Sequence, residues 1–291
     1  MKIFDPHIHL FDLAKGQYHW LKASNPPFWE DKSVIAKNFS ERSLSLTNIE
    51  LGGFVHIEAG FNNQQPAEEL AWLEQTVKSP FKSIATFDLL AQPTSNKALL
   101  TTLAQFNSFV GVRHILDDDA LAILTNPIAL KNFEMLNEMS AIFELQVYLS
   151  DNAIMSALLS AITNNPNIRF VLNHAGFPPY LPTTGTDDER KLQWQHWQSN
   201  LKQLASFENV WIKCSGWEMA SRQYHVSWQQ QVISNIISLF SEDKIMMASN
   251  FPLALFSHDY NTYWHQTFSL LQEQLQTKLC YSNALRCYEF A

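Results

Sequence analysis

Two histidines near the start of the chain, His7 and His9, are spaced so that they share one face of a β-strand. Side chains two residues apart on a strand point to the same side, so both imidazoles can meet one ligand. Such a pair can bind a metal ion or an anion, or it can be a hydrogen-bonded pair at the surface. The pair alone does not decide between these interpretations, and both stay open.

Polar or titratable side chains also stand at the ends of seven further short β-rich runs. One polar strand end is ordinary, but polar groups at all eight ends are difficult to explain as packing. In α/β proteins the carboxyl ends of parallel strands commonly carry the active site, so we expect a functional site at these strand ends. These residues are Glu58, Asp88, Arg113 with His114, Gln146 with Tyr148, Asn173 with His174, Lys213 with Ser215, and Ser249 with Asn250.

Several of these side chains also have a purely structural interpretation. Arg113 can bind a carboxylate or phosphate through its planar fork, or it can form an ion pair with Asp88. Lys213 lies within an apolar strand, where an ammonium without a partner is costly, so it requires a partner or a task. Glu58 can be a solvated strand end, and His174 can be a hydrogen-bonded core histidine.

Eight short runs with β-strand composition recur along the whole chain, and several are continuously apolar, as strands buried on both faces should be. They cover residues 2–7, 53–58, 83–88, 109–114, 143–148, 168–174, 209–215 and 244–250. Helical patterns lie between most of them, at 70–77, 94–107, 127–141, 154–162, 190–206, 233–240 and 259–276. The alternation predicts an α/β fold, a distorted (β/α)8 TIM barrel forming a single domain over residues 1–291.

An open, doubly wound sheet is the alternative architecture. No GxGxxG or P-loop segment follows the first run, which removes the usual reason to prefer that fold. Residues 12–50 form a long first connection with little regularity, and residues 177–189 are rich in Pro, Thr, Gly and Asp. Long loops in a compact domain are often binding loops or lids.

Composition and charge exclude several classes of protein. With 46% hydrophobic and 16% charged residues, the chain has an ordinary globular composition. Its net charge of −8, without a basic cluster, argues against nucleic-acid binding. No apolar run reaches the roughly 18 residues that span a bilayer, and Asp5 and Pro6 stand where a signal peptide needs an apolar stretch. Three cysteines without a CxxC indicate reduced thiols in a cytoplasmic protein, and we expect Cys214 to be buried and inert.

Six segments of the chain, taken together and in order, match a known pattern. They are Asp5 to Asp12 with Tyr18 and Trp20 following, Gly111 to His114, Asn173 to Pro178, Lys213 to Gly216, Ser249 to Pro252, and Asn283 to Tyr288. This ordered set resembles the amidohydrolase superfamily, in particular the amidohydrolase-related branch that includes sugar-acid lactonases and pyrone-dicarboxylate lactonase. The His-x-His is weak by itself, whereas the ordered set is specific and implies the barrel fold.

The resemblance implies a hydrolase acting at the barrel mouth, with His7, His9 and His174 in the site. In many superfamily members these histidines hold a divalent metal, zinc or manganese. In the lactonase-like branch the metal is often dispensable, and His and Arg side chains hold and polarise the substrate instead, so both kinds of site stay open. We expect the substrate-binding side chains to be His7, His9, Trp20, Arg113, His114, Tyr148 and Lys213.

Position 250 departs from the family, most members of which have an aspartate there that takes the proton from the attacking water. Asn250 is a neutral amide and cannot act as a base near neutral pH, so it would orient the water. Glu58 is the first candidate for the base, because many relatives carry glutamine at that point, and His174 is the second. The change also removes an anionic metal ligand, although the histidines and Glu58 could still hold Zn²⁺.

The leading hypothesis is a cytoplasmic hydrolase that opens a sugar-acid lactone or a small carboxylated lactone. Arg113 would hold a carboxylate or the ring carbonyl oxygen, and the three histidines would polarise the carbonyl, directly or through a metal. A metal-dependent decarboxylase of the same superfamily is one alternative, and a non-catalytic sugar-acid-binding barrel is another. We expect a small-molecule substrate as partner, with no nucleic acid and no membrane; the oligomeric state, a homodimer included, is open.

Overall fold

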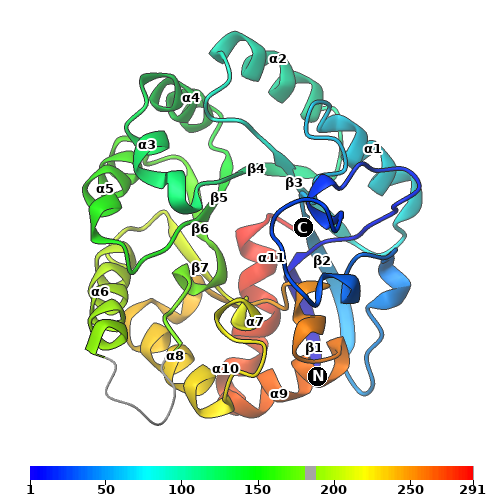
Figure 1. The fold of residues 1–291 in the computed structure, drawn as a ribbon, viewed down its shortest axis with the longest axis vertical. Helices are drawn as coiled ribbons and strands as arrows, with labels where there is room; N and C mark the ends of the chain where they lie inside the picture. The colour runs from blue at the N-terminus through cyan, green and yellow to red at the C-terminus, as the bar shows by residue number, and fades with distance from the viewer. Residues whose placement is uncertain (181–187, 291) are drawn as a thin grey trace. The chain divides into compact units, whose positions relative to one another are not determined.

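The computed structural model describes residues 1–180 and 188–290, and its strands belong to one eight-stranded sheet in the order of the chain, β1 to β8. β1 pairs with β2, β2 with β3, β3 with β4, β5 with β6 and β6 with β7, and all these pairs are parallel. Helices follow the strands along the chain (Figure 1), which confirms the predicted (β/α)8 fold class. The strands are β1 (Lys2–Ile8), β2 (Glu50–Ile57), β3 (Phe81–Thr86), β4 (Phe109–Ile115), β5 (Ile142–Gln146), β6 (Arg169–Leu172), β7 (Val210–Cys214) and β8 (Ile245–Met247).

All eight predicted runs contain a strand, but several strands end before the polar residues that the sequence assigned to them. β2 ends one residue before Glu58, β6 ends two residues before His174, and β8 ends three residues before Asn250. Tyr148 likewise follows β5 and is not part of it. The chemistry-bearing side chains therefore stand on the first residues of the loops, where the backbone is no longer constrained by ladder pairing.

The expected helices are present, with shifted ends, and three short ones were not predicted. The pattern at 259–276 is interrupted at Leu271, whose extended backbone separates two helices. The unpredicted helices are α3, α7 and α11, each too short to show a clear period. The helices are α1 (Ala67–Thr76), α2 (Pro93–Leu103), α3 (Ala120–Leu124), α4 (Pro127–Glu138), α5 (Met155–Asn164), α6 (Asp188–Ala205), α7 (Trp217–Ala220), α8 (Val226–Leu239), α9 (Tyr260–Leu270), α10 (Glu273–Thr277) and α11 (Asn283–Cys287).

Local capping explains where several helices begin. The Asn126 side chain accepts the backbone N–H of Ile128, and Pro127 occupies the first turn of α4. The Asp259 side chain accepts the N–H of Thr262 at the start of α9. The Asp151 side chain accepts the N–H of Ala153 in the short 3₁₀ turn Asn152–Ile154 that leads into α5.

The two long loops differ from each other in the structure. The first connection, 12–50, holds only three 3₁₀ turns, His19–Leu21, Lys32–Val34 and Glu41–Ser43, as its irregular sequence predicts. An antiparallel bridge between Phe11 and Phe39 closes it. In the second loop, predicted at 177–189, residues 181–187 lie outside the described residues, and 188–189 already belong to α6.

The chain divides into two compact units. The first unit comprises residues 1–87, 98–113 and 247–291, and the second comprises 88–97 and 114–246. In the first, Leu70 of α1 packs against Ala85 and Leu103. In the second, Phe133 of α4 contacts Phe143 of β5 and Phe170 of β6 through aromatic rings. No helix within the described ranges is long and apolar enough to cross a bilayer.

Candidate functional site

In the first unit, the carboxyl end of β1 brings His7 and His9 together, as their spacing predicts. The two ring centroids lie 5.1 Å apart and the ring planes are at 73° to each other. Backbone bonds hold this end beside the segment that follows β8. The N–H of His9 donates to the carbonyl of Phe251 at 2.7 Å, and the N–H of Asn250 donates to the carbonyl of His7 at 3.0 Å.

His9 is orientated by a bond to the end of β2. Its Nδ1 lies 2.9 Å from the carbonyl oxygen of Ile57. A carbonyl oxygen can only accept, so Nδ1 must carry the proton and donate it. Proton exchange and ligand binding are then left to Nε2, which is the arrangement that metal-binding and catalytic histidines commonly use.

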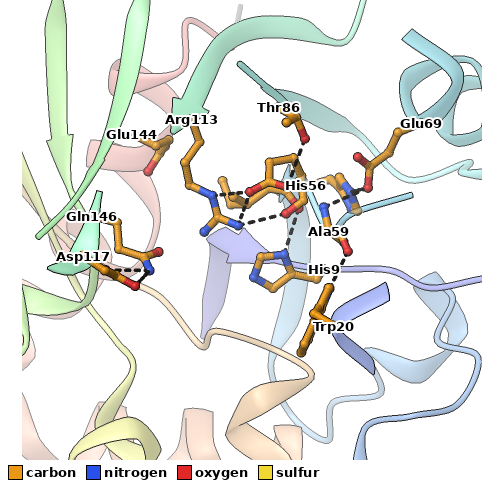
Figure 2. A network of polar contacts seen from close by, with 12 residues as sticks. His9, Trp20, His56, Ala59, Glu69, Thr86, Arg113, Asp117, Glu144 and Gln146 are labelled. Atoms are coloured by element: carbon orange, nitrogen blue, oxygen red, sulfur yellow. Dashed lines mark hydrogen bonds and ion pairs between the residues drawn. The ribbon is translucent and has the colours of Figure 1, made fainter. Parts of the chain in front are cut away.

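Arg113 of β4 and Glu58 form a buried ion pair next to His9. Nε and Nη2 of Arg113 lie 2.8 and 2.6 Å from Oε1 of Glu58, and Nη2 also donates to the Glu58 carbonyl oxygen at 3.0 Å. The hydroxyl of Thr86 donates to the other carboxylate oxygen at 3.1 Å. Figure 2 shows His9, Thr86 and Arg113 all directed at the end of β2.

These contacts bear on the predicted roles of both residues. Glu58 is no solvated strand end, because it is only 7% exposed and both of its oxygens accept hydrogen bonds. The structure gives Arg113 the Glu58 carboxylate as its ion-pair partner, and that contact fixes the orientation of the planar guanidinium. The same contacts orient the Glu58 carboxylate toward Arg113 and Thr86.

A second anchor, Asp5, holds the ends of β1 and β8 in register. Its carboxylate accepts the N–H groups of His7 and Ser249 at 3.2 and 3.1 Å, and the hydroxyls of Ser249 and Tyr260 at 2.5 and 3.1 Å. Complete burial raises the pKa of Asp5 to about 6, although these four donors act to lower it. Asp5 thus supports both His7 and the loop that carries Asn250.

Trp20 is held against the loop that follows β2. Its Nε1–H donates to the carbonyl of Ala59 at 2.8 Å, and its ring meets Phe11 edge-on at 5.8 Å. Trp29 continues the aromatic row at 6.4 Å from Trp20. Trp20 is therefore packed within the first unit, and its substrate-binding role stays a prediction.

In the second unit, His174 stands on a strained turn, Asn173–Gly176, that follows β6. His174, Ala175 and Phe177 all have φ near 50°, in the left-handed region that non-glycine residues avoid. Nδ1 of His174 lies 3.0 Å from the hydroxyl of Ser215. A Cβ built on Gly216 would lie 2.7 Å from the His174 ring, so only glycine fits beside it.

Lys213 has the partner that its apolar surroundings demanded. Its ammonium lies 2.7 Å from the carboxylate of Glu144 on β5, and neither side chain is exposed. Cys214, the next residue, is buried as expected, and burial raises the pKa of its thiol. This buried ion pair gives Lys213 a structural role, and its predicted contact with a substrate stays a prediction.

The remaining predicted residues of the second unit are less buried. Tyr148 is 37% exposed and lies against Phe177 with ring centroids 4.8 Å apart; burial and then the charge of Asp117 raise its pKa. Gln146 donates to Asp117 at 3.1 Å (Figure 2). Nδ1 of His114 accepts the N–H of Leu89 at 2.9 Å.

The structure thus brings together Trp20, His7, His9, Glu58, Arg113 and Asn250 within the first unit, and describes His114, Tyr148, His174 and Lys213 within the second. Their convergence at one mouth stays a prediction. Among residues 1–180 and 188–290, no three His, Cys, Asp or Glu side chains form a group that could hold a metal ion. The carboxylates near the β1 histidines already have partners, so the donor set of the first unit does not by itself fit a catalytic zinc site.

Sequence reasoning gave no role to three buried residues of the first unit, His56, Glu69 and Asp5. Glu69 stands four residues before Leu73, on the apolar face of α1, where an acidic residue is out of place. That mismatch is the signal that could have identified it. His56 was visible only as one more polar residue in β2, and its pairing with Glu69 could not be read from the spacing.

Comparison with known proteins gives the family. A family model described as "Amidohydrolase" matches residues 4–290. The L-rhamnono-gamma-lactonase of Scheffersomyces stipitis is 23% identical over 99% of this chain and 98% of its own length.

Two solved structures have the same fold. An amidohydrolase of Burkholderia multivorans, solved with HEPES and in another crystal form with zinc, is 18% identical with a TM-score of 0.79 and full coverage of both chains. A Pseudomonas putida protein assigned as a 2-pyrone-4,6-dicarboxylic acid hydrolase is 16% identical with a TM-score of 0.69, over 99% of this chain and 97% of that one. With nearly its whole length matched by the family model, the chain belongs to the amidohydrolase family.

Proposed function

We propose that the protein is a hydrolase that opens a lactone ring by attack of water. One observation carries the proposal: an imidazole and a guanidinium donate to consecutive carbonyl groups at the end of β2. Nδ1 of His9 is bonded to the carbonyl of Ile57, and Nη2 of Arg113 to the carbonyl of Glu58. The two groups are thereby held side by side in a buried setting, where charge stabilisation is most effective.

Ester hydrolysis needs stabilisation of negative charge, because that charge develops on the carbonyl oxygen as water adds. The planar Arg113 fork, oriented by Glu58, has the geometry that recognises carbonyl and carboxylate oxygens. His7 on β1 and His9 just after it stand next to each other and can contribute further polarisation. Asn250 can orient the attacking water but cannot take its proton.

Two residues are candidates for the base. The sequence ranks Glu58 first, but its bonds to Arg113 and Thr86 favour a role in holding the guanidinium. His174 bonds through Nδ1 to a hydroxyl, which can donate or accept, so its proton is not fixed by its partner. We therefore assign proton acceptance to His174 and orientation of Arg113 to Glu58.

The substrate class follows from the relatives together with Arg113. The curated relative is named for a sugar-acid lactone, and the Pseudomonas protein for a 2-pyrone, which is also a cyclic ester. A sugar-acid lactone or a small carboxylated lactone fits a guanidinium that recognises planar oxygen pairs. Because the donor set of the first unit does not by itself fit a catalytic zinc site, the proposal gives no step to a metal.

The test is a pH-indicator screen of sugar-acid lactones and 2-pyrone carboxylates, with metal-free protein and with added zinc or manganese. Ring opening releases a proton, so we expect acid production with at least one lactone. Failure of the whole panel, together with thermal stabilisation by a sugar acid, would favour a binding protein. Decarboxylation of an aromatic acid by protein with stoichiometric metal would favour a decarboxylase.

The Glu58→Gln variant separates the two assignments of the base. Glutamine keeps an oxygen for Arg113 but cannot take a proton, so we expect a loss of about tenfold or less in kcat, with binding retained. A loss of about a thousandfold, as expected on removing a general base, would return that role to Glu58.

A further inference from the structure

His56 of β2 and Glu69 of α1 form a buried pair that the proposed reaction does not use. His56 is fully buried and Glu69 is 2% exposed. Nε2 of His56 lies 3.0 Å from Oε1 of Glu69, and Figure 2 shows the two side chains facing each other. Burying a carboxylate costs free energy, which its hydrogen bonds must offset, so we ask what those bonds hold in place.

The hydrogen bonds of His56 determine which nitrogen carries its proton. The backbone N–H of Leu10 donates to Nδ1 at 3.2 Å. Because a backbone N–H can only donate, Nδ1 must be the unprotonated nitrogen, and the ring is neutral with its proton on Nε2. That proton is directed at Glu69, so the ring links the backbone of β1 to a buried carboxylate.

Glu69 completes the link to a second backbone position. The same Oε1 that accepts from His56 also accepts the N–H of Ala59 at 3.0 Å. Burial, and to a smaller extent the neighbouring charge of Glu58, raises the pKa of Glu69, while its two donors act to lower it. One carboxylate oxygen thus controls two points of the chain through two hydrogen bonds.

These two points directly follow two residues of the candidate site. Leu10 follows His9, and Ala59 follows Glu58, the partner of Arg113. A shift of the backbone at Leu10 would turn the His9 ring away from the carbonyl of Ile57. A shift at Ala59 would move the Glu58 carboxylate and with it the guanidinium.

We infer that His56 and Glu69 are positioning residues, which fix the backbone behind His9 and Glu58 and thereby set the relative placement of the imidazole and the guanidinium. The inference rests on the proposed function for its kinetic readout. Misplacement of such groups by about 1 Å can cost about a hundredfold in rate.

Substitution of Glu69 tests the inference with a matched control on the same helix. Glu69→Ala should lower kcat about a hundredfold with little change in KM, because the reacting groups are misplaced while substrate contacts remain. Glu69→Gln, whose amide oxygen can accept both bonds, should restore most of kcat. Glu68→Ala removes an exposed carboxylate bonded to Asn62 and should behave as wild type. Wild-type kcat in Glu69→Ala, or an equal loss in Glu68→Ala, would overturn the inference.

Two substitutions of His56 separate its two bonds. The amide of asparagine reaches the place of Nδ1 and can accept from Leu10, whereas the amide of glutamine reaches the place of Nε2 and can donate to Glu69. If His56 positions His9 through Leu10, the His56→Asn variant should retain a higher kcat than the His56→Gln variant. The reverse order would overturn this arm of the inference.

Nitrogen NMR of histidine-labelled protein gives a readout that does not depend on activity. His56 should show an unprotonated Nδ1 and a protonated Nε2, and the ring signals of His9 should shift in Glu69→Ala but not in Glu69→Gln or Glu68→Ala. Unchanged His9 signals in Glu69→Ala would overturn the inference. A wild-type protein that opens no lactone would refute the proposed function. The NMR result would still decide whether His56 and Glu69 position His9.

Discussion

His9 in the first unit and His174 in the second are both buried histidines bonded through Nδ1, but the chain holds them in different ways. His9 directly follows strand β1, and its partner is the carbonyl oxygen of Ile57. His174 stands in a left-handed turn, with φ 52° and ψ 35°, and its partner is the hydroxyl of Ser215. A backbone bond to Phe251 and a ring bond to Ile57 hold the first histidine, and a strained backbone presents the second.

The difference in partners has a chemical consequence. A carbonyl only accepts, so it keeps the proton of His9 on Nδ1, whereas a hydroxyl can donate or accept and allows the proton of His174 to move. Strained turns persist where the surrounding structure over-determines them, and they cluster at functional sites. Under the proposed function, this difference suits His9 to holding and polarising a substrate and His174 to accepting a proton.

The largest expected effect is that of His174→Asn. Asparagine tolerates the left-handed region and its amide can still bond Ser215, but no nitrogen remains at the place of Nε2. We expect kcat to fall about a thousandfold, as for removal of a general base, with the fold and substrate binding retained. The measurement is kcat and KM beside circular dichroism of the variant.

Ser215→Ala is the control for His174→Asn, because it removes the hydroxyl and leaves the base. It should lower kcat less than His174→Asn does. If the two variants were equal, or if His174→Asn remained active, the assignment of proton transfer to the second unit would be wrong.

The next largest effect is expected for Gly216→Ala. Its new Cβ would lie 2.7 Å from Cγ and Nδ1 of His174, and φ at this position is +73°. The ring must move, so we expect about a hundredfold lower kcat, and the left-handed backbone adds a stability cost of roughly 1–2 kcal/mol.

Gly52→Ala serves as the control for Gly216→Ala. There the added Cβ crowds Tyr281 and Lys2, and φ lies outside the strained region. It should lower the melting temperature without a comparable loss of kcat. Equal kinetic losses in the two variants would show that crowding in general, and not the placement of His174, reduces the rate.

The sequence predicted the strands and most helices, because apolar runs and capping residues act over short stretches of chain. It also predicted that Lys213 requires a partner, from the cost of an ammonium in an apolar strand. It could not name Glu144, which lies 69 residues away, nor the pairing of Glu58 with Arg113 across 55 residues. Such pairs depend on strand register, which single-residue patterns do not contain.

The left-handed turn at His174 was only partly visible. Gly176 is of a residue type common in tight turns, but nothing in the residue types of His174 and Ala175 predicts φ near 50° for both. Their conformation follows from tertiary packing, with Leu149 against Gly176 and the His174 ring against Gly216. The bonds of Glu58 to Arg113 and Thr86 are also tertiary contacts, so the sequence could not show them when it ranked Glu58 first as the base.

A smaller effect is expected for Arg113→Lys in the first unit. Lysine keeps the charge but loses the fork that reaches Oε1 and the carbonyl of Glu58 together. We expect kcat/KM to fall about tenfold to a hundredfold with the fold intact. Near-normal kinetics would reassign Arg113 to structure and would leave the first unit without its proposed substrate clamp.

An effect on stability and not on rate is expected for Asp5→Asn, which probes the support of His7 and Asn250. Burial raises the pKa of Asp5 from 3.8 to about 6, so the folded protein binds this proton more tightly than the unfolded chain does. The resulting stability is fully present below about pH 4 and is lost as the pH rises through about 6. A tenfold difference in proton affinity is worth about 1.4 kcal/mol, so the whole effect is at most roughly 3 kcal/mol.

Asparagine has no such titration, and the free energy of unfolding of the wild type should therefore decline relative to Asp5→Asn between about pH 4 and pH 6.5. Urea unfolding at a series of pH values, followed by tryptophan fluorescence, measures the difference. Parallel curves for the two proteins would mean that Asp5 keeps its charge in the fold, held by Ser249, Tyr260 and the His7 N–H. In that case the first unit would owe its fixed geometry to a buried anion, and the contrast with the strained turn of the second unit would become sharper.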